Sequence, residues 1–200
     1  PKKDDVCLDL CAAPGGKALH LWELMNGSGK VIARDISDYK VGLIEENIDR
    51  TEALGVKAEV YDATILDKDM IEKADIVIAD LPCSGLGVMG KKTDLKYKMT
   101  LDSAKELAAL QKEILAKVQA YVKPEGTLVY STCTVHVREN MENVNWFLKQ
   151  YPEFELVPIQ TLLPEELRES VEKEGCLQFI PGVHKSDGFF IAKFRKVKHG

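Results

Sequence analysis

A mostly apolar run at residues 74–79 (ADIVIA) leads directly into an acid, a proline and a cysteine. Its β-branched residues are typical of a strand that is covered on both faces in a parallel sheet. Pro82 and Gly85 are expected to end this strand. Ligands of open α/β sheets bind beyond the carboxyl ends of the strands, so the pattern predicts that Asp80 and Cys83 lie at a functional site.

Similar runs recur along the chain and alternate with residues at helical spacing. The other expected strands are residues 6–10, 29–33, 58–61, 126–131, 154–157 and 188–194. The expected helices are residues 18–25, 38–54, 101–122 and 138–150. Because parallel strands need crossover helices, this order of strand–helix units predicts an α/β fold with a doubly wound, mostly parallel sheet. The last two strands are expected to form a closing pair that adds an antiparallel edge.

Length and composition are typical of one globular domain. The chain has 200 residues, 45% of them hydrophobic, which is enough for a sizeable core. No apolar run approaches the ~20 residues of a membrane span, and we expect neither a span nor a signal peptide. The five cysteines show neither the CxxC spacing of zinc sites nor the density of a secreted disulfide scaffold. A cytoplasmic protein without a bound metal is therefore expected.

A glycine-containing turn at residues 11–17 (CAAPGGK) connects the first strand to the first helix. Its small residues let a ligand approach the backbone, and the helix N-terminus offers free N–H groups to a carboxylate or phosphate. The turn is neither a GxGxxG motif nor a Walker A loop, because Lys17 is followed by Ala18 and Cys11 stands where the first glycine should be. It predicts an anion-binding site of another kind.

Polar side chains follow several of the expected strands. Asp35 ends the second strand, ~20 residues past the glycine turn, where Rossmann-like folds hold ribose hydroxyls. The alternative is a surface acid that caps the next helix. Asp62 and Asp80 end the third and fourth strands, and a second thiol, Cys133, follows the fifth. This repetition predicts a functional site that is built from strand ends.

Charge gives two opposing indications about nucleic acid. The net charge of −5 argues against such a partner, since phosphate binding needs local lysine and arginine. However, a lysine cluster follows the Cys83 loop and includes one aromatic residue: Lys91, Lys92, Lys96, Tyr97 and Lys98. On composition alone, a solvated face is the simplest interpretation of this cluster.

Three motifs resemble the signature motifs of one enzyme family: DLCAAPGGKA (residues 9–18), DLPCSGLG (80–87) and YSTCT (130–134). They resemble those of the RNA cytosine-5 methyltransferases, the Nol1/Nop2/Sun family, in that family's order and spacing. Within the family, residues 85–97 and 187–194 are similar to the bacterial 16S ribosomal RNA enzymes. The resemblance implies a Rossmann-like S-adenosylmethionine-dependent fold. It also implies that residues 1–200 form a catalytic domain whose N-terminal RNA-binding region lies outside this sequence.

The resemblance also implies roles for individual residues. The methionine end of S-adenosylmethionine would lie on the turn, whose residues are Cys11, Ala12, Ala13, Pro14, Gly15, Gly16 and Lys17. Asp35 would bind the ribose hydroxyls and Asp62 the adenine amino group. Asp80 would lie close to both the cofactor and the target cytosine. Cys133 would be the nucleophile, and Cys83 would assist release of the product. The implied partner is RNA, most directly 16S ribosomal RNA, and the lysine cluster would then contact it.

Two alternatives remain beside this reading. In a DNA cytosine-5 methyltransferase Cys83 would be the nucleophile, but the STC turn and the lack of an ENV-type motif after Cys83 argue against that. A non-catalytic RNA-binding module of methyltransferase fold would need neither thiol, yet both thiols and Asp80 are present. The chemistry itself favours a cysteine enzyme, because carbon 5 of cytosine becomes nucleophilic only after a thiolate adds to carbon 6.

Overall fold

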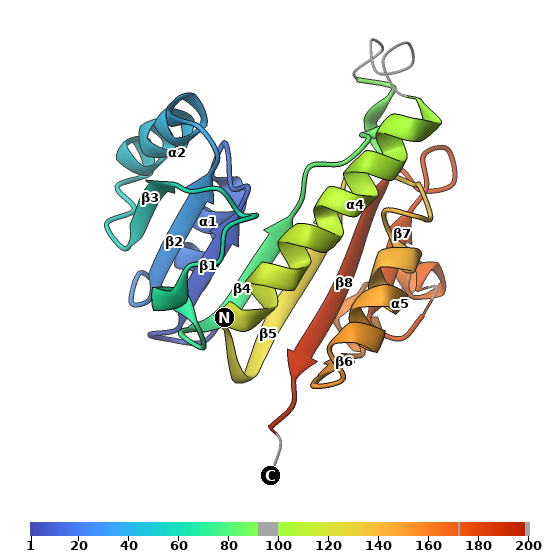
Figure 1. Ribbon diagram of the computed structural model, residues 1–200. Coiled ribbons are helices and arrows are strands. Elements are labelled where there is room, and N and C mark those ends of the chain that lie inside the picture. Colours follow the sequence, from blue (N-terminus) through green and yellow to red (C-terminus); the bar gives the residue numbers. More distant parts are fainter. Residues whose placement is uncertain (92–99, 172, 199–200) are drawn as a thin grey trace. The chain divides into compact units, whose positions relative to one another are not determined.

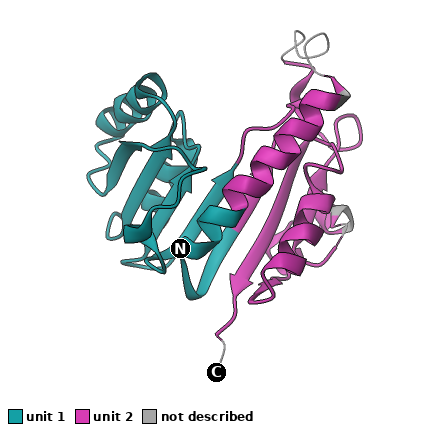
Figure 2. Ribbon diagram, in the orientation of Figure 1, with its two compact units in different colours: residues 1–80, 116–128 teal, residues 81–115, 129–200 magenta. Residues whose placement is uncertain are grey.

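The computed structural model describes residues 1–91, 100–171 and 173–198 (Figure 1). The chain divides into two compact units (Figure 2). The first unit contains residues 1–80 and 116–128, and the second contains residues 81–115 and 129–200. Helix α4 (Leu101–Val118) and strand β5 (Val122–Thr132) each belong partly to both units.

The first unit is a parallel α/β sheet. Its strands are β1 (Val6–Leu10), β2 (Lys30–Asp35), β3 (Val56–Val60), β4 (Ala74–Asp80) and the first part of β5, in the order β3-β2-β1-β4-β5. β1 pairs with β2 and β4 in parallel, and β2 pairs with β3 in parallel. Helices α1 (Gly16–Leu24) and α2 (Asp38–Thr51) connect the first three strands. The predicted parallel sheet is confirmed here.

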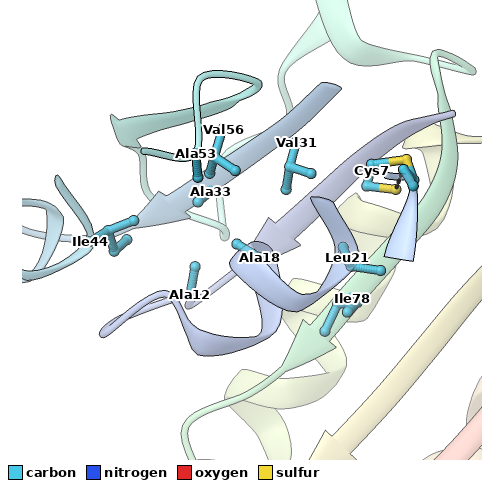
Figure 3. Packing of buried hydrophobic residues seen from close by; sticks show 11 residues of the cluster. Cys7, Ala12, Ala18, Leu21, Val31, Ala33, Ile44, Ala53, Val56 and Ile78 are labelled. Carbon is cyan, nitrogen blue, oxygen red and sulfur yellow. Dashed lines mark hydrogen bonds between the residues drawn. The ribbon is translucent and has the colours of Figure 1, made fainter. Parts of the chain in front are cut away.

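Small and branched apolar side chains hold these helices on the sheet. In Figure 3, Ala18 and Leu21 of α1 lie over the strand residues Cys7, Val31 and Ile78. Alanine allows the helix backbone to approach the sheet closely, and the β-branched residues fill the space between strands. The cluster consists of Cys7, Ala12, Ala18, Leu21, Met25, Val31, Ala33, Ile44, Ala53, Val56 and Ile78.

The second unit contains an antiparallel group of strands. β6 (Phe154–Leu156) and β7 (Cys176–Phe179) both pair with β8 (Phe189–Lys196) in antiparallel orientation. Helix α5 (Met141–Gln150) contributes Phe147, whose ring centroid lies 4.9 Å from that of Phe194 and 5.1 Å from that of Phe154. The antiparallel edge predicted from the sequence is confirmed.

Short 3-10 helices complete the described chain: Lys68–Met70, Leu86–Val88, Gln119–Tyr121, Gln160–Leu162 and Glu165–Ser170. The first of them stands between β3 and β4, where none of the helices expected from the sequence lies. Helix α4 ends at Val118, and the 3-10 helix Gln119–Tyr121 follows it. The expected helix 101–122 is therefore an α-helix with a 3-10 helix after it. Among the described residues, no helix is long and apolar enough to cross a membrane.

The bounds of most elements differ from the prediction by a few residues, and one strand was not expected. β5 begins at Val122 and includes Pro124. Proline has no N–H to donate, and its exposed position near the start of the strand tolerates this. Helix α5 begins at Met141 rather than at residue 138, because residues 136–140 form turns that bury two polar side chains, Glu139 and Asn140. β7 was not expected, since this four-residue strand is too short to show a clear alternation.

Candidate functional site

The glycine turn is shaped by two residues with left-handed backbone conformations. Cys11 has φ 59° and Gly15 has φ 101°. The Gly15 N–H donates to the Ala12 carbonyl over 2.7 Å, which closes the turn. A Cβ at Gly15 would lie 3.1 Å from the Cγ2 of Ile44 in α2, so glycine satisfies both the conformation and the packing. Helix α1 then begins at Gly16, with its N-terminus at the turn.

A cavity of about 220 Å³ lies at this turn, within the first unit. It is lined by Asp9, Cys11, Ala12, Ala13, Pro14, Gly16, Lys17 and Asp80. The Lys17 ammonium forms an ion pair with Asp80 over 2.5 Å, and both side chains are partly exposed. The structure therefore brings the predicted turn residues together with the acid that ends β4. Gly15 belongs to the turn but does not line the cavity.

Asp35 is attached to the same turn. Its carboxylate accepts hydrogen bonds from the N–H groups of Ala13 (3.0 Å) and Ile36 (2.8 Å), and it pairs with Lys40. The alternative role as a helix cap is wrong, because α2 is capped by Ser37, whose side chain accepts from the Lys40 N–H. The carboxylate is held at the carboxyl end of β2, as the sequence predicted, although it does not line the cavity.

Asp62 follows β3 and is not among the residues that line the cavity. One of its oxygens accepts hydrogen bonds from the hydroxyl (2.7 Å) and the N–H (2.9 Å) of Thr64. These two hydrogen bonds lower the pKa of Asp62, so it is ionised at neutral pH.

Asp9 is a buried acid in the cavity wall that the sequence reasoning missed. Its side chain is 1% exposed, and neither oxygen makes a hydrogen bond of ordinary geometry. Burial raises the pKa of Asp9 to about 7, Lys17 and the Ala18 N–H oppose this rise, and Asp80 adds to it. An acid within the apolar strand VCLDL was the signal that could have revealed it.

Asp9→Asn should remove a pH dependence of stability. The carboxyl has an ordinary pKa of 3.8 and a folded-state pKa of about 7, so the folded state retains a proton that the unfolded state has lost between these values. The free energy of unfolding contributed by Asp9 therefore falls as the pH rises through this window, by about 1.4 kcal/mol per pH unit. Urea denaturation from pH 4 to 8 should show Asp9→Asn gaining on the wild type up to pH 7. Parallel curves would refute the buried proton.

The second unit brings the two predicted thiols into contact. The Sγ atoms of Cys83 and Cys133 are 3.2 Å apart, and the Cys133 N–H donates to the Cys83 sulfur over 3.2 Å. The hydrogen bond with Cys133 and burial together raise the pKa of the Cys83 thiol well above its ordinary range. Cys83 is therefore a neutral thiol at physiological pH.

The other three cysteines lie in β1, in the glycine turn and in β7. Cys7 and Cys176 are fully buried, and all five cysteines are free thiols. Burial raises the pKa of Cys7 and of Cys11 to about 12, which makes both poor nucleophiles. Within the part of the chain that the structure describes, no cluster of three or more histidines, cysteines or acids could hold a metal.

The loop after Cys83 meets the loop before β8 at two glycines. The Gly188 N–H donates to the Gly87 carbonyl over 2.8 Å, and the Gly87 N–H donates to the Cys133 carbonyl over 3.1 Å. A Cβ at Gly87 would lie 2.2 Å from the Gly188 carbonyl oxygen and 2.8 Å from that of Cys133. Only glycine allows this approach of three backbone segments.

Gly87→Ala should therefore destabilise the fold by about 1–3 kcal/mol, since the added methyl group has to displace backbone. Gly90→Ala is the matched control, because a Cβ there meets nothing within 4 Å. The free energy of unfolding of both variants can be measured by chemical denaturation. Equal stability of the two variants would contradict the close approach at Gly87.

The lysine cluster is described only at its first residue. Lys91 forms an ion pair with Asp187 over 2.6 Å. Lys92, Lys96, Tyr97 and Lys98 lie outside the described residues.

The parallel sheet, with helix α1 beginning at the cavity, is the fold of a Rossmann-like methyltransferase. The chain belongs to the RsmB/F family, because the family model described as "16S rRNA methyltransferase RsmB/F" matches residues 1–195. The family implied by the sequence motifs is thereby confirmed.

Individual relatives agree with this family. The chain is 42% identical to "Probable ribosomal RNA small subunit methyltransferase B" of Bacillus subtilis, over 98% of this chain and 44% of that protein. It is 34% identical to ribosomal RNA small subunit methyltransferase F of Cronobacter sakazakii, over 94% of this chain and 39% of the relative. The crystal structure of NSun6 from Pyrococcus horikoshii with SFG matches with a TM-score of 0.85 and 34% identity, over 100% of this chain and 50% of that one. The chain thus spans less than half the length of these two methyltransferases B and F.

Proposed function

We propose that this chain is the catalytic domain of an enzyme that methylates carbon 5 of a cytosine in RNA, with 16S ribosomal RNA as the substrate. The observation that carries the proposal is the 3.2 Å contact between the sulfur atoms of Cys83 and Cys133. Two free thiols in contact suit a reaction in which one adds to the base and the other assists its release. A non-catalytic RNA-binding module would have no use for such a pair.

The cavity of the first unit suits the amino-acid end of S-adenosylmethionine. That end carries an ammonium and a carboxylate, and the cavity presents the carboxyl groups of Asp9 and Asp80 and the ammonium of Lys17. Asp9 has no hydrogen-bonding partner of its own there, and the N-terminus of α1 adds a positive dipole end for a carboxylate. We assign the methionine end to the backbone of residues 11–17, with Lys17 exchanging its ion pair with Asp80 for the cofactor's carboxylate.

Two further acids are assigned to the rest of the cofactor. Asp35 would accept hydrogen bonds from the ribose hydroxyls, because the Ala13 N–H and Lys40 fix its carboxylate beside the turn. Asp62 would accept from the adenine amino group, which suits an ionised carboxylate held by Thr64. When bound, the cofactor supplies an electrophilic methyl group on its sulfonium.

The chain's own residues would then activate the base. The Cys133 thiolate adds to carbon 6 of cytosine, which makes carbon 5 nucleophilic enough to accept the methyl group. Asp80, as a carboxylic acid, donates a hydrogen bond or a proton to N3 and so stabilises the negative charge that develops on the ring. A base then removes the proton of carbon 5, and the carbon–sulfur bond breaks. The Cys133 sulfur leaves as the thiolate that began the reaction, which a hydrogen bond from the neutral Cys83 thiol stabilises, and N3 returns its proton to Asp80.

The raised pKa of Cys83 also bears on the DNA-type alternative, in which Cys83 is the nucleophile. A thiol that retains its proton is a poor nucleophile but can donate a hydrogen bond. A cytosine in an RNA loop is cheaper to expose than one paired in a duplex, and the lysine cluster from Lys91 onwards would contact the RNA backbone. In the reducing cytoplasm all five cysteines would remain thiols.

The proposal is tested by methyl transfer from labelled S-adenosylmethionine to 16S ribosomal RNA transcripts, with duplex DNA of matched cytosine content as the second substrate. Digestion to nucleosides followed by mass spectrometry should find the label in 5-methylcytidine alone. Label in another nucleoside, or in DNA only, would refute the proposed substrate. Absence of transfer to either substrate by the full-length protein would refute the activity.

A further inference from the structure

Beneath the two thiols of the second unit lies a buried acid that no part of the proposed reaction uses. Glu139 is 0% exposed, and within the described part of the chain it forms no ion pair with a lysine, arginine or histidine. Both of its carboxyl oxygens accept hydrogen bonds: one from the Ser84 N–H (2.8 Å) and the Gln111 amide (3.0 Å), the other from the Ser84 hydroxyl (2.5 Å). The carboxyl group is thus satisfied entirely by neutral donors.

These donors belong to the residues on either side of Cys83. Ser84 follows Cys83 directly, and Pro82 precedes it. The amide of Gln111, which donates to Glu139, also donates to the Pro82 carbonyl over 2.9 Å. Glu139 and Gln111 together therefore fix both neighbours of the thiol.

The same carboxyl group is linked to the turn that carries the second thiol. The Ser84 hydroxyl, which donates to Glu139, lies 2.8 Å from the Thr134 hydroxyl. Thr134 follows Cys133 directly, and its carbonyl accepts from the Asn140 amide over 3.0 Å. Because Glu139 and Asn140 are adjacent in the chain, one buried turn holds the segments of both cysteines.

A second layer of hydrogen bonds fixes Glu139 and Gln111 themselves. The Gln111 carbonyl oxygen accepts from the Asn143 amide over 2.8 Å and from the Tyr130 hydroxyl over 3.1 Å. The Tyr130 hydroxyl also donates to the main-chain carbonyl of Glu139. Among the described residues, the Asn143 Oδ1 is the one side-chain polar atom of this network without a partner. The many hydrogen bonds of the other atoms favour one arrangement of the loops.

Burying a carboxyl group without a cation costs desolvation free energy, whereas apolar residues of similar volume would fill the core without this cost. The role of this carboxyl group is therefore to position the chain segments around it. We infer that Glu139 is a positioning residue that holds the Pro82–Ser84 segment against the Thr132–Thr134 turn, so that the two thiols stay in contact through the reaction. The inference rests on the proposed function, in which both thiols act.

The contact itself can be measured with dibromobimane, which becomes fluorescent when it bridges two nearby thiols. The full-length wild type should cross-link, and Cys83→Ser gives the background, because Cys7 and Cys176 are fully buried. In Glu139→Gln an NH2 group replaces one acceptor oxygen and faces the donors of Ser84 or Gln111. Cross-linking should fall about tenfold, which corresponds to about 1.4 kcal/mol.

The matched control is Glu142→Gln, the same change three residues further along on the exposed surface of α5. It should cross-link as the wild type does. Should Glu139→Gln fail to fold, Ser84→Ala removes only the hydroxyl between Glu139 and Thr134 and should lower cross-linking about threefold. Wild-type cross-linking in a folded Glu139→Gln or Ser84→Ala protein would overturn the inference.

Methyl transfer supplies the readout that a merely structural residue would not change. Glu139→Gln should lower kcat about 100-fold and leave the KM for S-adenosylmethionine within about twofold, because the cofactor cavity lies in the other unit. Reduced cross-linking with unchanged kcat would overturn the role in the reaction. A wild type that cross-links but transfers no methyl group would refute the proposed function, and the comparison of cross-linking would still decide whether Glu139 holds the thiols.

Discussion

Cys133→Ala is expected to abolish the covalent adduct with 16S ribosomal RNA that contains 5-fluorocytidine, whereas Cys83→Ala is expected to retain it. Fluorine at carbon 5 cannot be eliminated as a proton, so the protein remains bound to the base and the adduct survives on a denaturing gel. Methyl transfer to ordinary RNA should fall about 10⁴-fold or more in Cys133→Ala, the scale of losing a nucleophile.

The two thiols are distinguished by their motifs, and they are in contact in the structure. The hydrogen bond with Cys133 and burial raise the pKa of the Cys83 thiol, which favours its neutral form. A neutral thiol 3.2 Å from the reacting sulfur can donate a hydrogen bond to the thiolate that leaves when the carbon–sulfur bond breaks. Cys83→Ala should therefore slow release and accumulate adduct even with unmodified RNA.

Cys176→Ala is the matched control for this experiment. Its thiol is fully buried in β7 of the same unit and belongs to neither motif, so the variant should form adduct and turn over as the wild type does. The opposite pattern, in which Cys133→Ala forms adduct and Cys83→Ala does not, would assign the roles as in DNA cytosine-5 methyltransferases. Loss of adduct in all three variants would point to misfolding rather than to chemistry.

Local patterns in the sequence were enough to locate most strand ends of the first unit. The strand at β4 is apolar and β-branched, and it stops at Asp80 because Pro82 and Gly85 follow. The turn of residues 11–17 was equally readable, since its glycines and small residues have no other common use between a strand and a helix. These features depend on neighbouring residues, which a single sequence displays.

The roles of residues that depend on partners far away in the sequence could not be predicted in this way. Glu139 looks like an ordinary acid at the start of a helix, and its role depends on Ser84 and Gln111, 55 and 28 residues away. Asp9 was visible as an acid in an apolar strand, but its burial depends on the packing of α1. The contact of the two thiols was implied by family motifs and not by spacing, because Cys83 and Cys133 are 50 residues apart.

Asp80→Asn is expected to lower kcat about 10²–10⁴-fold, the contribution of a general acid, without unfolding the protein. An amide cannot protonate N3 of cytosine, whereas it occupies the same volume as the carboxyl group. The ion pair that is lost, with Lys17, joins two side chains that are 46% and 24% exposed, and such pairs contribute little to stability. The free energy of unfolding should therefore change by less than about 1 kcal/mol.

Asp75→Asn is the control for this experiment. It shows whether the loss of kcat in Asp80→Asn follows from removing any acid of β4. Asp75 lies near the opposite end of the same strand, where it pairs with Lys123 over 2.8 Å and accepts from the Val6 N–H. That variant should lose stability and keep its turnover, the reverse of Asp80→Asn. Turnover of Asp80→Asn within a few-fold of the wild type would show that Asp80 does not donate the proton to N3. Its role would then be the ion pair with Lys17. The buried Asp9 is the other acid that lines the cavity and could replace Asp80 as the proton donor.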